Sequence, residues 1–172
     1  MARTAFALSL LLTGFASVAL AQGGETIVGT WKLVSPLETT AEGAIVQNPF
    51  GPHPTGFLTY TEDGRAMAII TYDGRKSLSV NDRTAAPAEE PAEAFATAFA
   101  NAGRYTFTGA KVTHQVEAST AQNWVNTDLV RVVKLEGNRQ VLSTASGVTM
   151  GGVKIRSTEL VWERWEAKKP LG

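Results

Sequence analysis

Tyr105, His114 and Arg131 are the residues of this chain whose types best suit chemistry on a small molecule. A tyrosine hydroxyl donates and accepts hydrogen bonds, a histidine exchanges a proton near neutral pH, and an arginine keeps its positive charge. Above an apolar floor these groups would bind a carboxylate, an enolate or a carbonyl, or would act as general acid and base on a bound substrate. The alternative is structural: His114 bonds Tyr105 or a buried carbonyl, and Arg131 pairs with an acidic side chain or a carbonyl.

A predicted β-hairpin brings Tyr105 and His114 together. Gly109-Ala110 has the signature of a two-residue turn with glycine in its first position. If Thr108 pairs with Lys111, Tyr105 lies opposite His114, because side chains alternate between the two faces of a strand. The rest of their face is apolar and consists of Phe107, Val112 and Val116. The hairpin therefore predicts an interior that carries a few polar groups, which need partners or a ligand.

Arg131 belongs to a second predicted hairpin. Apolar strands over residues 126–136 and 140–146 flank the turn Gly137-Asn138. Pairing across that turn puts Arg131 on the same face as Val133 and Leu142. We therefore expect Arg131 to point into the interior that the first hairpin faces.

Residues 57–72 predict a third hairpin, whose strands 57–60 and 66–72 are joined by Glu62-Asp63-Gly64-Arg65. Both faces of this hairpin are fairly apolar. We pair Thr61 with Ala66, which gives a shared face of Leu58, Tyr60, Met67 and Ile69.

One α-helix is expected near the middle of the chain, over residues 91–102. Alanine, glutamate and phenylalanine dominate this stretch, Pro91 suits a first helical turn, and Gly103 suits a C-cap. Phe95 and Phe99 would share one helix face, which we expect to pack over an open end of the fold.

With further strands predicted over residues 27–37 and 153–165, the chain has eight or nine strands, mostly joined as hairpins. No alternation of strand and helix indicates a parallel sheet. The expected fold class is all-β: an antiparallel up-and-down barrel with one inserted α-helix. Eight strands leave an interior that can hold one small ligand.

The first residues predict a secretory signal peptide. Arg3 precedes an apolar run that ends in Ala19-Leu20-Ala21, a small-residue cleavage pattern. We expect a signal peptide over 1–21 cut between Ala21 and Gln22, a linker over 22–26, the barrel domain over 27–166 and a tail over 167–172. The mature protein would be periplasmic or secreted, without a membrane anchor. The alternative is an uncleaved anchor helix.

The composition excludes some kinds of site and partner. The 172-residue chain has no cysteine, so it has neither a thiol nucleophile nor a thiolate metal site. Its 16 basic and 16 acidic residues give no net charge, and no basic run indicates a nucleic acid partner. Two histidines in different contexts do not predict a metal site, and no glycine-rich loop joins a strand to a helix. We expect no cofactor.

Several runs of this sequence resemble the bacterial lipocalin-like domain family. Gly29-Thr30-Trp31 is similar to the Gly-x-Trp start of calycin-type barrels, and Arg164 matches the arginine that lies across that tryptophan. Further matching runs lie at 56–65, 103–107, 114–119, 123–125 and 160–164, with Arg131 as well. The resemblance implies that Trp31 and Arg164 close one barrel end, a contact that a cation–π interaction would favour. It also implies a small-molecule site more firmly than any reaction.

Aromatic residues of the predicted strands and loops are candidates for the wall of that site. With the three polar residues they complete the expected ligand-binding set: Tyr60, Tyr72, Trp124 and Trp162. Three functions stay open. The first is an exported binding protein for a small, partly apolar ligand with an anionic or carbonyl head. The second is a cofactor-free isomerase, cyclase or lyase, and the third is an envelope interaction module with a filled core.

Overall fold

The structure, a computed structural model, describes residues 26–145, 149–150 and 153–165. The expected signal peptide, most of the linker, Glu166 and the tail lie outside the described residues. The elements are β1 (Gly29–Thr40), β2 (Ile45–Gln47), β3 (Thr55–Tyr60), β4 (Arg65–Thr71), α1 (Glu89–Ala96), β5 (Ala98–Phe107), β6 (Lys111–Ser119), the 3-10 turn η1 (Gln122–Trp124), β7 (Asp128–Glu136), β8 (Arg139–Ala145), β9 (Thr149–Met150) and β10 (Val153–Arg164).

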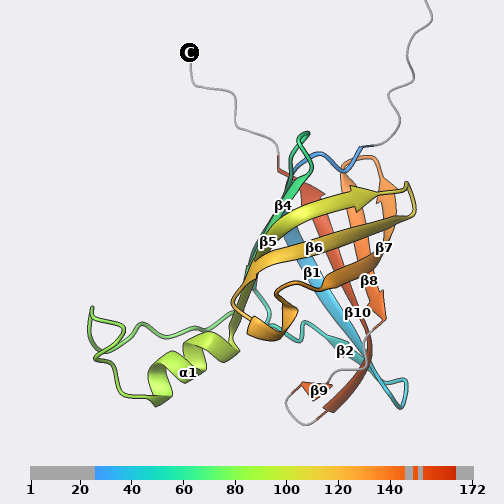
Figure 1. The fold of residues 1–172 in the computed structure, drawn as a ribbon. Helices are drawn as coiled ribbons and strands as arrows, with labels where there is room; N and C mark the ends of the chain where they lie inside the picture. Colours follow the sequence, from blue (N-terminus) through green and yellow to red (C-terminus); the bar gives the residue numbers. More distant parts are fainter. Residues whose placement is uncertain (1–25, 146–148, 151–152, 166–172) are drawn as a thin grey trace, which may run out of the picture.

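Eight antiparallel strands form a closed barrel (Figure 1). Their order around the ring is β1-β3-β4-β5-β6-β7-β8-β10, and β10 returns to pair with β1. The short strands β2 and β9 extend the sheet beside β1 and β10. The predicted all-β, up-and-down barrel with one inserted helix is confirmed.

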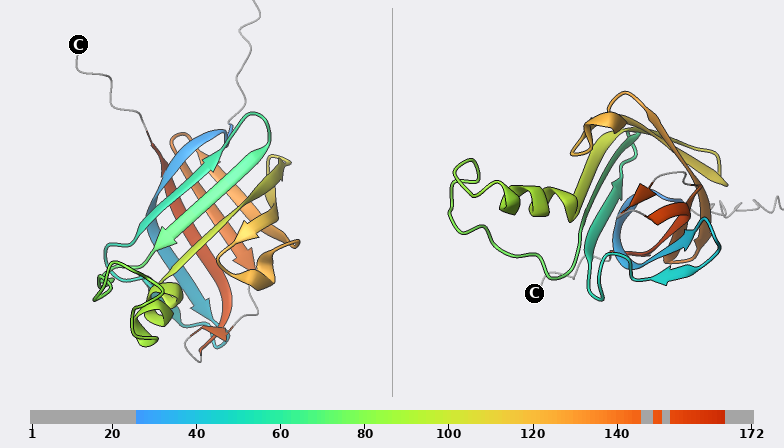
Figure 2. Two further views of the ribbon diagram at one scale, coloured as in Figure 1. Left: turned by 60° about the vertical axis from the view of Figure 1, so that its left-hand side comes forward. Right: turned by 90° about the horizontal axis from the view of Figure 1, so that it is seen from below.

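The two ends of the barrel differ in what they carry. Thr30 and Trp165 lie side by side at one end, where the Trp165 amide donates to the Thr30 carbonyl over 2.7 Å. We call this the termini end; it is at the top of Figure 1, and the opposite end is the loop end. At the loop end, residues 72–97 connect β4 to β5 and contain α1. This helix lies beside the ring of strands when the barrel is viewed from below (Figure 2).

The helix prediction was wrong in extent and in position. Helix α1 ends at Ala96, and residues 98–102 belong to β5, where they pair with β4. Gly103 is no helix cap: a Cβ there would lie 1.9 Å from the Gln115 carbonyl oxygen, so glycine permits a close approach at a bulge. Helix α1 buries no side chain, and Phe95 is exposed rather than packed over an open end. Strand pairing outweighs the helix propensity of this alanine-rich stretch.

Two hairpin registers follow their predicted turns. Thr108 pairs with Lys111 and Tyr105 lies opposite His114, as the Gly109-Ala110 turn requires. Across the next turn Val133 lies opposite Leu142, which also matches the prediction.

The register of the third hairpin was wrong by one residue. Tyr60 pairs with Ala66 rather than Met67, because Thr61 bonds Arg65 and the loop has three residues, not four. Gly64 ends this loop with φ +83°, the left-handed conformation that follows a type I turn in three-residue hairpins. Tyr60 and Leu58 therefore share the inner face with Ala66 and Ala68, while Met67 and Ile69 point outward.

The core lies inside the barrel. Its largest fully buried side chains are Trp31, Trp162 and Tyr60. Strand β1 contributes Trp31 and Leu33, and then a bulge between Leu33 and Ser35 turns Pro36, Glu38 and Thr40 inward instead of Ser35. By contrast, several inward side chains on the opposite wall stay partly exposed although they pack on the core: Tyr105, Phe107 and Leu135.

Candidate functional site

A chain of three polar side chains crosses the barrel interior. The Tyr60 hydroxyl lies 2.8 Å from Nε2 of His114, and Nδ1 of the same ring lies 3.2 Å from Nη1 of Arg131. The three residues come from β3, β6 and β7. His114 is 3% exposed and Tyr60 is 1% exposed, so this polar chain lies among core side chains.

The direction of each hydrogen bond follows from Arg131. A guanidinium only donates, so Nδ1 of His114 must accept. The neutral ring then carries its hydrogen on Nε2 and donates it to the Tyr60 oxygen. The Tyr60 hydroxyl hydrogen is not needed in this bond and remains available to an acceptor inside the barrel.

The charges of the group are set by its burial. Desolvation first, and the charge of Arg131 second, lower the pKa of His114 to about 3, so the ring is neutral at physiological pH. Burial raises the pKa of Tyr60, which keeps its proton. Burial also lowers the pKa of Arg131, but a guanidinium retains its charge. The site at neutral pH therefore holds one positive charge and two neutral rings.

Arg131 is the cation of the site and has no carboxylate partner among the described residues. Its described hydrogen bonds both use Nη1, one to His114 and one of 3.4 Å to the Leu129 carbonyl. Protein atoms surround the side chain, yet it keeps partial surface exposure. The described contacts thus hold the guanidinium by Nη1 inside the barrel wall, beside the His114 ring.

Tyr105 does not belong to the polar chain. Its hydroxyl donates to the Thr61 carbonyl over 3.0 Å, and its ring lies 4.8 Å from the Tyr60 ring. The predicted pairing of Tyr105 with His114 across the hairpin is correct, but the hydroxyl that reaches His114 is that of Tyr60. The sequence did not bring Tyr60 and His114 together because they are 54 positions apart.

The remaining aromatic candidates separate into two places. Trp162 is 1% exposed within the core. Tyr72 stacks on Phe50 at 4.6 Å, and Phe50 and Trp124 each make an edge contact with Phe99 at about 6 Å. This aromatic cluster lies toward the loop end, so Tyr72 and Trp124 are not brought together with Tyr60 and His114.

Trp31 and Arg164 meet at the termini end as the resemblance implied. The Arg164 guanidinium lies 4.2 Å from the centre of the Trp31 ring. It also donates to the carbonyls of Val28 and Thr26, over 2.6 Å and 2.7 Å. The indole of Trp31 donates to the Ile27 carbonyl over 2.8 Å. These contacts join the two strands that close the ring.

Four residues carry buried side-chain polar atoms with no hydrogen-bond partner among the described residues: Glu38, Asn101, Gln140 and Trp162. Trp162 was expected as an aromatic wall residue, whereas the sequence did not single out the other three. For Gln140 a signal was present, since strand alternation puts it on the face of Leu142 and Arg131. Burial raises the pKa of the Glu38 carboxyl. Burial first, and the charge of that carboxyl second, raise the pKa of Tyr72.

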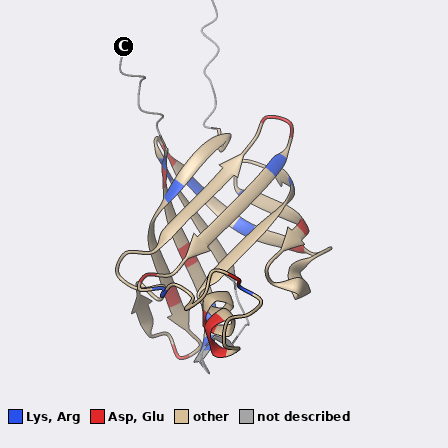
Figure 3. Cartoon of the chain, turned by 90° about the vertical axis from the view of Figure 1, so that its left-hand side faces the viewer, with Lys and Arg blue, Asp and Glu red and all other residues tan. Residues whose placement is uncertain are grey.

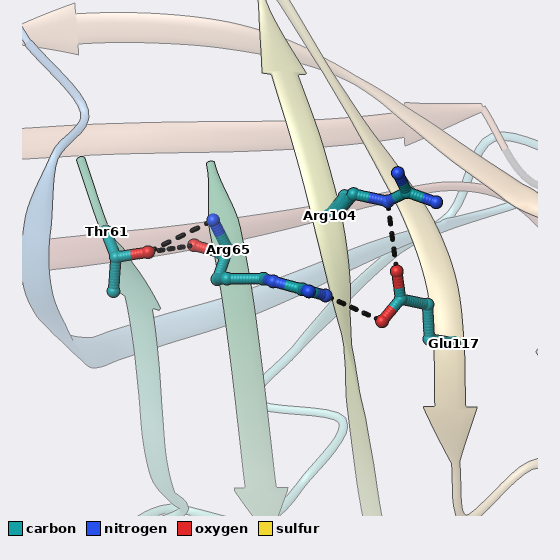
Figure 4. A network of polar contacts seen from close by, with 4 residues as sticks. All are labelled: Thr61, Arg65, Arg104 and Glu117. Atoms are coloured by element: carbon teal, nitrogen blue, oxygen red, sulfur yellow. Dashed lines mark hydrogen bonds and ion pairs between the residues drawn. The ribbon is translucent and has the colours of Figure 1, made fainter. Parts of the chain in front are cut away.

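The outer face of β4–β6 carries polar and apolar features. Glu117 bridges the guanidinium groups of Arg65 and Arg104 with bonds of 2.7 Å and 3.0 Å, and Thr61 binds the Arg65 backbone (Figure 4). Toward the loop end, Met67 and Ile69 line a shallow apolar groove of about 480 Å³. Acidic and basic residues intermingle over the side shown in Figure 3.

Other site types find little support in the part of the chain that the structure describes. Across 26–145, 149–150 and 153–165, no three histidine or acidic side chains gather in a way that could hold a metal ion. None of the helices among these residues is long and apolar enough to span a membrane.

Comparison with known proteins points to one family. The family described as "Lipocalin-like domain" matches residues 28–165. A curated relative from Aspergillus oryzae, named "4'-hydroxy-3'-methoxypropiophenone carrier protein ppsC", is 32% identical over 101 residues, which are 54% of this chain and 85% of that protein. A solved structure, the lipoprotein YedD of Klebsiella pneumoniae, covers 87% of this chain and 79% of its own at 12% identity, with a TM-score of 0.37.

Proposed function

The chain belongs to the lipocalin-like domain family, and from that premise we propose that it is an exported carrier for a small, partly apolar molecule with a carbonyl or anionic head. The observation that carries the proposal is the buried chain Arg131–His114–Tyr60, which ends in a cation without a described acidic partner and in an available hydroxyl hydrogen.

The polar chain matches the head of such a ligand. A carbonyl or carboxylate oxygen accepts hydrogen bonds, and both Arg131 and Tyr60 have donors to offer. His114 fixes both partners: it accepts from Arg131 and donates to Tyr60, so its ring holds them in place. The apolar body of the ligand would rest on the partly exposed inner side chains of β5 and β7, including Phe107 and Leu135.

The pKa values favour binding over proton transfer. A general acid or base works best with a pKa near the working pH. The pKa of His114 is about 3 and that of Tyr60 is raised, so neither group exchanges a proton readily near neutrality. This supports a carrier ahead of an isomerase, cyclase or lyase.

The curated relative supports the same class of ligand. Its name describes it as a carrier of an aryl ketone, a molecule with an apolar ring and a carbonyl head. We therefore take 4'-hydroxy-3'-methoxypropiophenone as the first probe for this chain.

The test is calorimetric titration of the probe into wild type and variants. Arg131→Ala should weaken binding by about 1.5–3 kcal/mol, roughly 10- to 150-fold, the range for a hydrogen bond to a charged group. Arg104→Ala is the matched control, because that arginine lies on the outer face and should leave affinity unchanged. Equal affinities for wild type and Arg131→Ala would overturn the assignment of the head group.

Other outcomes separate the alternatives. Conversion of the bound probe to a product, lost in His114→Ala while binding persists, would favour the enzyme. Absence of binding by the probe and by any molecule found on the protein purified from its own envelope in native mass spectrometry would favour the module with a filled core.

A further inference from the structure

Among the residues that the structure describes, Gln140 and Trp162 are the most completely buried of those with unpaired polar atoms. Gln140 is 0% exposed, and neither its amide nitrogen nor its amide oxygen has a partner among the described residues. Trp162 is 1% exposed, and its indole nitrogen also lacks one. Buried polar atoms are nearly always hydrogen-bonded, so two such residues together require an explanation.

The two residues are direct neighbours. Trp162 of β10 lies opposite Gln140 of β8, and residues in that relation have Cβ atoms about 4.5–5.5 Å apart on the same face. Their neighbours across the adjoining strands are Leu33 and Leu135, which offer no side-chain hydrogen bond. The two side chains therefore share one face of neighbouring strands, in an apolar part of the interior.

The fold satisfies comparable groups elsewhere in the barrel. The indole of Trp31, equally buried, donates to the Ile27 carbonyl. The hydroxyl of Tyr105 donates to the Thr61 carbonyl. Glu38 on β1 and Asn101 on β5 each have one such unpaired atom, but among these residues only Gln140 and Trp162 are paired directly across neighbouring strands.

We propose that Gln140 and Trp162 form a second subsite, which takes a hydroxyl group of the carried ligand. The inference rests on the proposed carrier function and narrows its ligand class to molecules that have a carbonyl or anionic head and a hydroxyl elsewhere.

A hydroxyl group can pair with the Trp162 indole nitrogen and with the Gln140 amide oxygen, two of the three unpaired atoms. An indole only donates, so Trp162 needs an acceptor, whereas the Gln140 oxygen needs a donor. A hydroxyl oxygen accepts from the Trp162 N–H while its hydrogen is donated to the Gln140 oxygen. A ketone or ether oxygen at the same place would accept but could not donate, and it would leave the Gln140 oxygen unpaired.

The experiment compares two probes that differ only in this group, propiophenone and 4'-hydroxypropiophenone. Wild type should bind the hydroxylated probe about tenfold more tightly, the effect of about 1.4 kcal/mol of net hydrogen bonding. Gln140→Leu should reduce this preference to within about twofold while it keeps its affinity for propiophenone. Gln115→Leu, a change on the exposed outer face of β6, is the matched control and should keep the preference.

A second measurement reads ligand binding on wild type, and a variant at the site is used only to assign one signal. In a ¹⁵N-labelled sample the indole N–H signal of Trp162, assigned with Trp162→Phe, should shift on addition of the hydroxylated probe and much less with propiophenone. Three results would each overturn the subsite. Wild type could bind both probes equally, Gln140→Leu could keep the full preference for the hydroxylated probe, or the Trp162 indole signal could shift equally with both probes.

The two proposals fail in different ways. If both probes bind equally and Arg131→Ala weakens both, the carrier function stands and only the hydroxyl subsite falls. If neither probe binds wild type, the carrier proposal fails for this ligand class and the subsite falls with it.

Discussion

Replacing Gln140 by leucine should make the ligand-free protein more stable. The amide is fully buried with both polar atoms unpaired, and mutational data put the cost of such a buried amide at about 1–3 kcal/mol. Leucine is close to glutamine in size and would join Leu33, Leu135 and Leu142 without that cost. The expected gain in the free energy of unfolding is therefore about 1–3 kcal/mol.

The gain can be read in thermal unfolding. In a domain of this size each kcal/mol moves Tm by about 2–4 °C, which predicts a rise of about 2–12 °C. Urea unfolding at fixed pH gives the same quantity independently through the midpoint. Gln115→Leu serves as control and should change stability by no more than about 0.5 kcal/mol, since that side chain is exposed. A Tm of Gln140→Leu below that of wild type would refute the reasoning, because it would mean that the amide is hydrogen-bonded in solution.

Three further predictions concern closure, pH and export. Arg164→Ala should destabilise the barrel by about 1–3 kcal/mol through lost packing and cation–π contact, and a urea midpoint within about 0.3 kcal/mol of wild type would contradict the Trp31 contact. His114 has a folded pKa of about 3 against 6.5 ordinarily, so the unfolded chain binds the proton first and stability should fall as pH drops from about 6.5 toward 3. His114→Gln should flatten that decline in urea midpoints, and an unchanged slope would point to other groups. The mature protein recovered from the envelope should begin at Gln22 by N-terminal sequencing, and an intact Met1 would exclude cleavage.

Most of the fold could be predicted from short-range sequence patterns. The Gly109-Ala110 and Gly137-Asn138 turns set their registers correctly, because a two-residue turn leaves little freedom in pairing. The loop 62–64 was miscounted by one residue, since the chain alone does not show that Gly64 closes a bulged turn. Residues 98–102 were assigned to a helix because their alanine-rich composition favours one. In the structure these residues pair with β4 and form part of a strand.

The site was predictable as a set of residue types, but not as a set of contacts. Alternation along β6 and β7 puts His114 and Arg131 on inner faces. The contact of Tyr60 with His114 joins strands that are not neighbours in sequence or in the ring, so it depends on how the barrel closes. Gln140 was overlooked because a glutamine next to a turn is usually solvated, and only the structure shows it fully buried.

The pairing of β1 with β10 has a consequence for the order of events during synthesis. Val28 and Arg164, which meet at this seam, are 136 positions apart, and contacts of such long range form slowly because a large loop must first be closed. Until β10 has been made, β1 lacks the partner on one of its edges, and an unpaired edge readily recruits strands from other chains. Folding of this barrel should therefore be limited by the late pairing of β10 with β1. The partly synthesised chain, in which one edge of β1 is unpaired, is the state that most needs a chaperone.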